Sequence, residues 1–222
     1  MNTAEKMIVT RWWWVRHAPV VDAKSAKLSG QMDIDADVSD TASFASLAAR
    51  LPSGGVWITS HLKRTRQTAE ALWAAGAERV EPFVERDFAE QAFGAWTQMT
   101  WAEIGALDDA ETQAFWDAPA TIAPPPSADF STESFAEVCI RVARRLEELS
   151  EAHSGRDIVC VAHAGSIRAA VAHALGLSAE QALALDVKNT ALTRLDHIGN
   201  GSGGGLRVKR GGSWRVVGLN MI

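Results

Sequence analysis

Apolar positions along this chain fall into short continuous runs that alternate with segments of helical spacing. The runs are rich in β-branched and aromatic residues and cover residues 7–15, 56–59 and 158–162. Such runs are typical of strands buried within a parallel sheet. Apolar side chains three and four positions apart predict helices, and they occur at residues 39–51, 63–75 and 131–150. This alternation predicts an α/β fold, a three-layer α/β/α sandwich with a mostly parallel central sheet.

Weaker signals complete the predicted order of elements. They indicate a strand at 80–84, a helix that follows Gly165 and ends at Gly176, a strand at 191–195, and a hairpin of strands 206–209 and 213–217. The long helix 131–150 is expected to be capped by Ser131 or Thr132, ahead of Glu133.

Residues 89–130 interrupt the pattern. They contain Pro119 and the run 124–126 of three prolines, scattered tryptophans and phenylalanines, and no clear strand. We therefore expect a single domain over residues 1–222, in which 89–130 form a helical or loop insertion over one end of the sheet. Between Arg86 and Arg141 there is no Lys or Arg, so this insertion is acidic.

Composition excludes several classes of protein. The chain has 222 residues, 47% of them hydrophobic, and a net charge of −5, which allows a substantial core and argues against disorder. No basic block is present, so we expect neither nucleic acid nor membrane as partner. The N-terminus is too polar for a secretory signal, and Cys139 and Cys160 fall in a predicted helix and strand. These features predict a cytoplasmic protein with two unpaired thiols.

Polar residues that could bind a ligand or react with it follow three of the predicted strands. Arg16 and His17 end the first strand, Arg64 lies just after the second, and His163 follows 158–162. In an open parallel sheet the carboxyl ends of the strands meet, so two histidines and two arginines should converge. Arginine suits tetrahedral oxyanions, and a helix starting near Gly165 would direct free N–H groups at the same point. The pattern predicts a phosphate site.

Four ordered segments carry a specific resemblance. Residues 15–19 (VRHAP), 59–69 (TSHLKRTRQTA), 90–96 (EQAFGAW) and 161–168 (VAHAGSIR) resemble the motifs of the histidine phosphatase superfamily, which includes cofactor-dependent phosphoglycerate mutases and α-ribazole phosphatases. The resemblance extends from about Ile8 to Leu195 and implies the phosphoglycerate mutase-like fold.

The resemblance implies a role for each matching residue. His17 corresponds to the nucleophile, Glu90 to the proton donor, and the phosphate pocket comprises Arg16, Arg64, His163 and the backbone at Ala164. A neutral imidazole can attack phosphorus directly, forming a phosphohistidine. Arg16, Arg64 and a protonated His163 would balance the charge on the phosphoryl oxygens. No metal or other cofactor is required.

Other carboxylates compete for the acid role. Glu85 and Asp87 lie within a few residues of Glu90, but the spacing to Gly94 favours Glu90. Glu133 resembles the Glu of the family's Gly-Glu-Ser segment, and it is equally consistent with a substrate contact and with a carboxylate at a helix N-terminus.

The chain departs from the family pattern at five positions, which are Ala18, Ala23, Gln98, Thr132 and Ala164. Ala18 and Ala164 replace glycines after the two histidines, and we expect their N–H groups to stay available. Ala23 replaces an Asn, so one hydrogen bond to phosphate is in doubt. Thr132 and Gln98 stand where Gly is usual.

The insertion bears on the choice between phosphatase and mutase. An acidic cover would repel a second phosphate, whereas its aromatic residues suit an uncharged or π-rich leaving group or form the core of the insertion. These residues are Trp96, Trp101, Phe115, Trp116 and Phe130. Residues 93–96 and 99–104 resemble the α-ribazole phosphatase branch. We therefore expect a phosphomonoesterase acting on a small phosphorylated metabolite, with α-ribazole phosphate as candidate.

Alternative functions stay open at this point. They are phosphoglycerate mutase-type phosphoryl transfer, a catalytically silent protein that binds a phospholigand, and a metal-dependent hydrolase. The last lacks the paired-histidine spacing of a zinc site. The sequence leaves the question of a homodimer open.

Overall fold

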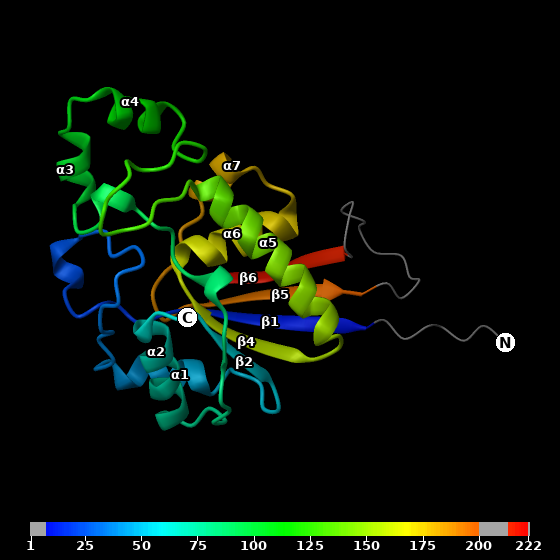
Figure 1. The fold of residues 1–222 in the computed structure, drawn as a ribbon. Coiled ribbons are helices and arrows are strands. Elements are labelled where there is room, and N and C mark those ends of the chain that lie inside the picture. Colours follow the sequence, from blue (N-terminus) through cyan, green and yellow to red (C-terminus); the bar gives the residue numbers. More distant parts are fainter. Residues whose placement is uncertain (1–7, 200–212, 222) are drawn as a thin grey trace.

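A computed structural model describes residues 8–199 and 213–221 and contains a six-stranded sheet (Figure 1). The strands are β1 (Val9–Arg16), β2 (Val56–Thr59), β3 (Phe83–Val84), β4 (Asp157–Ala162), β5 (Leu192–Ile198) and β6 (Ser213–Met221). Their order is β3-β2-β4-β1-β5-β6. The first four in this order are mutually parallel, β5 is antiparallel to β1, and β6 is antiparallel to β5. The prediction of a mostly parallel sheet is confirmed.

Helices cover both faces of this sheet and make the two outer layers (Figure 1). On one face lie α1 (Thr41–Ala48) and α2 (Lys63–Ala74). On the other lie α5 (Phe135–Ala152), α6 (Ala164–Leu175) and α7 (Ala179–Leu183), of which α7 is too short to have been predicted. The predicted α/β/α sandwich is therefore correct.

The central strand β1 anchors the fold. Trp12 and Trp14 are fully buried on the α5 side, stack with ring centroids 5.2 Å apart, and contact Phe88 edge-on. Burial of each such ring contributes about 2–3 kcal/mol. The Trp12 indole N–H also donates to Ser150 Oγ at 2.9 Å. The residues that follow β1, beginning with His17, are therefore held on a rigid support.

The start of α5 differs from the prediction. Ser134 is the N-cap and forms a capping box with Glu137, whereas Ser131 or Thr132 was expected ahead of Glu133. Thr132 instead forms a β-bridge with Phe93, and the Glu133 N–H donates to a carbonyl at Ala92. Because 132–133 pair with the insertion in an extended form, the helix starts later.

The C-terminal strands can be compared only in part with the prediction. The predicted strand 206–209 and its hairpin turn lie outside the described residues. The predicted strand 213–217 is present within β6, and it pairs with β5.

The insertion 89–130 lies beyond the carboxyl ends of the parallel strands (Figure 1). It contains α3 (Trp101–Gly105), α4 (Ala110–Asp117) and the 3-10 turn η3 (Gly94–Trp96), preceded by η2 (Arg86–Phe88). Its own core consists of Trp96, Ile104 and Phe115. A bridge between Lys27 and Thr100 joins it to the segment after β1, near the 3-10 turn η1 (Ala23–Ser25).

Two further features follow from the described residues. Cys139 on α5 and Cys160 on β4 are both free thiols, as expected. Within residues 8–199 and 213–221, no helix is both long and apolar enough to cross a membrane.

Candidate active site

The ends of β1, β2 and β4 bring three of the predicted residues together. His17 follows β1, Arg64 lies in the first turn of α2 after β2, and His163 follows β4. Arg64 Nε donates to His17 Nε2 at 3.3 Å, and the two imidazole rings have centroids 5.0 Å apart. All three side chains are buried. The convergence predicted from strand ends is therefore observed.

His17 is held as a neutral imidazole with one defined tautomer. Its Nδ1 lies 2.6 Å from the Ala18 carbonyl oxygen. A carbonyl only accepts, so Nδ1 carries the proton and Nε2 carries the lone pair. Burial, followed by the charge of Arg64, lowers the pKa of His17 well below its usual value. The side chain therefore presents a neutral nitrogen with nucleophilic capacity.

Two arginines supply fixed positive charge. Arg64 donates its terminal nitrogens to the carbonyls of Met32 and Gly30, both at 2.7 Å. Burial lowers the pKa of Arg64 to about 10, so it stays charged near neutral pH. Arg16 donates Nη1 to the Val187 carbonyl at 2.5 Å, while its buried Nε has no partner among the described residues. Both arginines line the central pocket.

His163 is completely buried and is oriented by one hydroxyl. Its Nε2 lies 2.7 Å from Ser60 Oγ, and its buried Nδ1 has no partner within the described part of the chain. Burial, then the charges of Arg64 and His17, lower the pKa of His163 well below its usual value. A cation at His163 would be desolvated beside other cations, which disfavours the protonated form that the sequence suggests.

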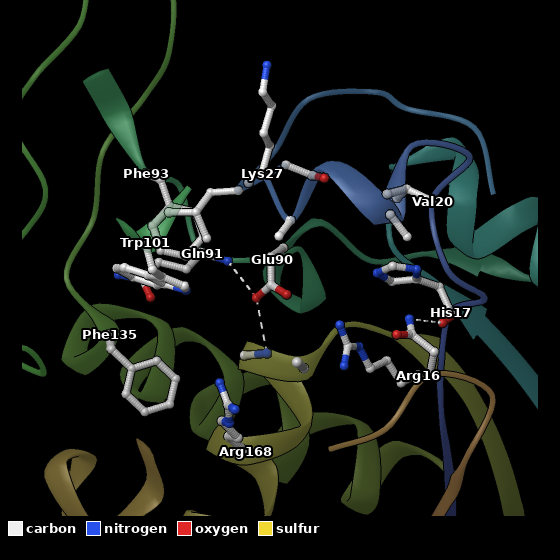
Figure 2. Close-up of a pocket in the computed structure, with 18 of the residues that line it drawn as sticks. Arg16, His17, Val20, Lys27, Glu90, Gln91, Phe93, Trp101, Phe135 and Arg168 are labelled. Carbon is white, nitrogen blue, oxygen red and sulfur yellow. Dashed lines mark hydrogen bonds between the residues drawn. The ribbon is translucent and has the colours of Figure 1, made fainter. Parts of the chain in front are cut away.

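Glu90 rests on the first turn of α6 (Figure 2). Its Oε1 accepts from the N–H groups of Gly165 and Gln91, both at 3.0 Å. A Cβ on Gly165 would lie 2.3 Å from that oxygen, so only glycine permits this approach. Ser166 Oγ donates to the Phe88 carbonyl at 2.8 Å and ties the same segment to α6.

The competing carboxylates lie elsewhere. Glu85 pairs with Arg145 at 2.5 Å and Asp87 pairs with Arg144 at 2.5 Å. Neither lines the central pocket, whereas Glu90 does. The geometry therefore favours Glu90, as the spacing to Gly94 predicted.

Arg16, His17, Arg64 and Glu90 line one pocket of about 740 Å³, whereas the fully buried His163 does not line it. Its catalytic end contains Arg16, His17, Arg64, Glu90 and Ala164. Its other walls include Phe93, Trp101, Phe115, Trp116 and Phe135. Ala164 and Gly165, in the first turn of α6, line this end of the pocket; their amides have no helical acceptors, and the Gly165 N–H donates to Glu90. The pocket thus joins a cationic end to an aromatic wall (Figure 2).

Two aromatic residues considered for the substrate are placed differently. Trp96 is only 2% exposed and packs against Phe115 inside the insertion, so it belongs to the insertion core and not to the pocket lining. Phe130 lies beside a separate, smaller hollow. Trp101 does line the pocket and is 44% exposed.

Glu133 is a structural clamp in this arrangement. It forms an ion pair with Arg141 at 2.8 Å and accepts from the Ala92 N–H at 3.1 Å. It precedes the Ser134 cap and does not line the pocket, so neither the helix-terminus role nor a substrate contact matches its position. Arg141 also donates to the Glu90 carbonyl at 3.3 Å. The pair therefore positions the backbone of Glu90.

The departures from the family pattern have local explanations. The Ala18 N–H donates to Thr68 Oγ1 at 2.9 Å. It is therefore not free to bind phosphate, contrary to the expectation from the sequence. Gln98 adopts φ of 71°, the left-handed conformation that glycine favours. Thr132 Oγ1 donates to the Pro124 carbonyl at 2.6 Å. Ala23 lines the pocket but offers no side-chain donor.

Sequence reasoning missed two cationic residues of the pocket wall, Lys27 and Arg168. Arg168 lies four residues after Ala164, and this helical spacing places both on one face of α6. That signal was present within the segment 161–168. Nothing local marked Lys27, which the fold brings to the pocket by pairing with Thr100.

No group of three His, Cys, Asp or Glu side chains suited to a metal ion occurs in the described ranges. The pocket is lined instead by the guanidinium groups of Arg16 and Arg64, which suit an oxyanion.

The family model of the histidine phosphatase superfamily (branch 1) matches residues 12–204. The chain belongs to this superfamily. No curated protein sequence matches the chain.

Solved structures share the fold. An α-ribazole phosphatase from Shigella flexneri is 18% identical, with a TM-score of 0.73 over 95% of this chain and 96% of that one. A mycobacterial glucosyl-3-phosphoglycerate phosphatase is 24% identical, with a TM-score of 0.75 over 96% and 100%. A phosphoserine phosphatase from Entamoeba histolytica, solved with 3-phosphoglyceric acid, is 20% identical, with a TM-score of 0.74 over 96% and 98%. Family and neighbours together support a phosphoric monoester hydrolase.

Proposed function

We propose that this protein is a metal-independent phosphomonoesterase that works through a phosphohistidine at His17. The observation that carries the proposal is the neutral His17 imidazole, whose Nε2 lies 3.3 Å from Arg64 Nε in the same pocket as Glu90. A neutral nitrogen attacks phosphorus without prior loss of a proton. The adjacent guanidinium carries the charge that the transferring phosphoryl group needs.

In the first step, the Arg64 Nε–H leaves the His17 Nε2 lone pair for a phosphoryl oxygen, Nε2 forms a bond to phosphorus, and the ester P–O bond breaks. Glu90 gives its proton to the leaving oxygen, which departs as an alcohol. The His17 ring gains positive charge, and its Nδ1–H donates to the Ala18 carbonyl, which stabilises that charge. In the second step, water attacks phosphorus, Glu90 takes a proton from it, and the N–P bond breaks to release phosphate.

The phosphoryl oxygens are met by donors that exist before substrate binds. The guanidinium groups of Arg64 and Arg16, which both line the pocket, supply two positive charges beside His17. With Ser60 donating to His163 Nε2, the proton lies on Nδ1, which donates to a phosphoryl oxygen. The Ala164 amide adds the N-terminus of α6. Charges held in place before the reaction lower the barrier because little rearrangement is needed during it.

The substrate is a small phosphorylated metabolite. The structural neighbours are named for α-ribazole phosphate, glucosyl-3-phosphoglycerate and phosphoserine, which differ in their leaving groups. Phe93, Trp101 and Phe135 give this pocket an apolar wall beside the leaving-group position. α-Ribazole phosphate is a candidate because its aromatic base could stack on that wall.

Release of phosphate from a panel of phosphomonoesters in excess EDTA tests the proposal. The panel includes α-ribazole phosphate, phosphoserine and phosphoglycerates, and the control is His17→Ala. We expect metal-independent release that His17→Ala abolishes. Release that survives this substitution would overturn the mechanism. Interconversion of phosphoglycerates without net release would support the mutase alternative, and phosphate binding without turnover would support a silent binding protein.

A further inference from the structure

Arg168 occupies a position that the phosphoryl chemistry does not use. It lies on α6 one turn after Ala164 and lines the pocket. Figure 2 shows its guanidinium directed into the pocket, with Phe135 to one side and Glu90 above. Since Glu90 is the proposed proton donor, Arg168 lies on the side where the leaving group must sit.

The hydrogen bonding of Arg168 leaves most of its donors free. Nε donates to the Leu185 carbonyl at 2.6 Å, which fixes the direction of the guanidinium. Neither terminal nitrogen has a hydrogen-bond or ion-pair partner in residues 8–199 and 213–221. The contact of Arg168 with the 185–187 segment uses Nε alone. The terminal nitrogens therefore form an oriented fork without an acceptor, the geometry that binds a carboxylate or phosphate.

The electrostatic surroundings favour an anion at this fork. Burial and then the positive charge of Arg168 lower the pKa of Arg16, so the two guanidinium groups interact. The carboxylates that raise the pKa of Arg16 are Glu90 and Asp186. Glu90 is neutral when it carries the proton for the leaving group, so it does not compensate Arg168 at that stage. Phe135 and Leu183 also line the pocket and reduce the access of water. A partly desolvated cation gains more from an ionic partner than an exposed one does.

We infer that Arg168 is a second anion-binding subsite and that the preferred substrates carry a carboxylate or phosphate on the alcohol that leaves. This inference rests on the proposed function and narrows its substrate class to phosphorylated acids and bisphosphates. The expectation that the pocket repels a second anion rested on the lack of Lys and Arg in the insertion. The inference revises it, because Arg168 enters the pocket from α6 and not from the insertion. α-Ribazole phosphate, whose leaving alcohol carries no such group, would then be a poorer substrate than a phosphorylated acid or a bisphosphate.

A matched series of esters tests the subsite. Propyl phosphate, 3-phosphooxypropanoate and 1,3-propanediol bisphosphate share a three-carbon chain and differ in the group at its end. In the Arg168→Met variant we expect kcat/KM to fall by about 10- to 100-fold for one or both anionic esters and by less than about threefold for propyl phosphate. The ester whose kcat/KM falls shows whether the subsite binds a carboxylate or a phosphate. Arg79→Met, which removes the same charge from an exposed position, controls for net charge.

Two results would overturn the inference. An equal loss for all three esters would mean that Arg168 acts only by holding the 185–187 segment and, through Val187, Arg16. No loss for any ester would place Arg168 outside the site.

Binding of non-hydrolysable phosphonates separates this inference from the proposed function. Calorimetry with 4-phosphonobutanoate and butylphosphonate needs no turnover. We expect wild type to bind 4-phosphonobutanoate at least about tenfold more tightly, and Arg168→Met to remove that difference. Equal binding of the two compounds by wild type would contradict the subsite, whatever the enzyme hydrolyses. Absence of turnover with the binding difference intact would overturn the catalytic proposal alone.

Discussion

The Glu90 carboxylate accepts a hydrogen bond from the Gly165 N–H at 3.0 Å. This contact places the proposed acid on the first turn of the same helix that follows His163 and offers its N-terminus to the phosphoryl group. One element therefore fixes the distance between acid and phosphorus. A shift of the carboxylate by one ångström would affect proton transfer without removing any charge.

Substitution of Gly165 by Ala should displace the acid. The new Cβ would lie 2.3 Å from Glu90 Oε1, so the carboxylate must move, while alanine suits the helix itself. We expect kcat for an alkyl phosphate to fall by about tenfold or more, with little change in melting temperature. Steady-state kinetics and a thermal melt check this. Full activity in a folded Gly165→Ala variant would show that this contact does not position the acid.

Glu90→Gln should separate substrates by their leaving groups. Hydrolysis of alkyl phosphates should slow by about 10²- to 10⁴-fold, because alkoxides leave badly without a proton. Phosphorylation of the enzyme by p-nitrophenyl phosphate should be spared, giving a burst before a slow steady state in stopped-flow measurements. Asp87→Asn is the matched control, since Asp87 pairs with Arg144 outside the pocket. If Asp87→Asn shows the divergence instead, the acid has been misassigned.

The two active-site histidines should stay neutral below the usual histidine range. Burial, then the charge of Arg64, lowers the pKa of both His17 and His163 in the folded state. In the unfolded chain they gain protons near pH 6.5. The unfolded state therefore binds more protons, and the free energy of unfolding should decrease as the pH falls below about 6.5. Imidazole ¹⁵N spectra at pH 6 should show both rings neutral. Titration of His17 with a midpoint near 6.5 would contradict this.

Gln98→Gly should stabilise the insertion. Gln98 adopts φ of 71°, a conformation that costs a residue with a side chain about 1–2 kcal/mol. Glycine relieves this cost but adds entropy to the unfolded chain, so we expect a net gain of about 0.5–1 kcal/mol. Urea denaturation measures it, with Gln98→Ala as a control that keeps the Cβ. Equal stability of the two variants would show that the backbone there carries no strain.

The parts of the fold and site that could be predicted are those encoded in local runs. The strand 56–59 consists of β-branched and aromatic residues between Gly55 and Ser60, and its predicted ends are the observed ones. His17, Arg64 and His163 could be expected to meet because each follows a strand of one parallel sheet. Glu90 was favoured over its neighbours by its spacing from Gly94.

What could not be predicted depends on pairing between distant segments. The helix α5 starts at Phe135 because Thr132 pairs with Phe93, a contact 39 positions apart in the printed sequence. Likewise the Ala18 N–H is taken by Thr68. The lowered pKa of His163 results from burial and from the charge of Arg64, which no spacing reveals. Such features arise only once the layers pack.

The most direct test of the account is to trap the covalent intermediate. Wild-type protein mixed with a ³²P-labelled phosphomonoester and quenched in alkali should carry label that is stable to alkali and lost in acid. Mass spectrometry should locate it on His17, with His17→Ala unlabelled and His153→Ala, altered outside the pocket, labelled as wild type. Label on another residue, or turnover by His17→Ala, would contradict the proposal that His17 is the nucleophile.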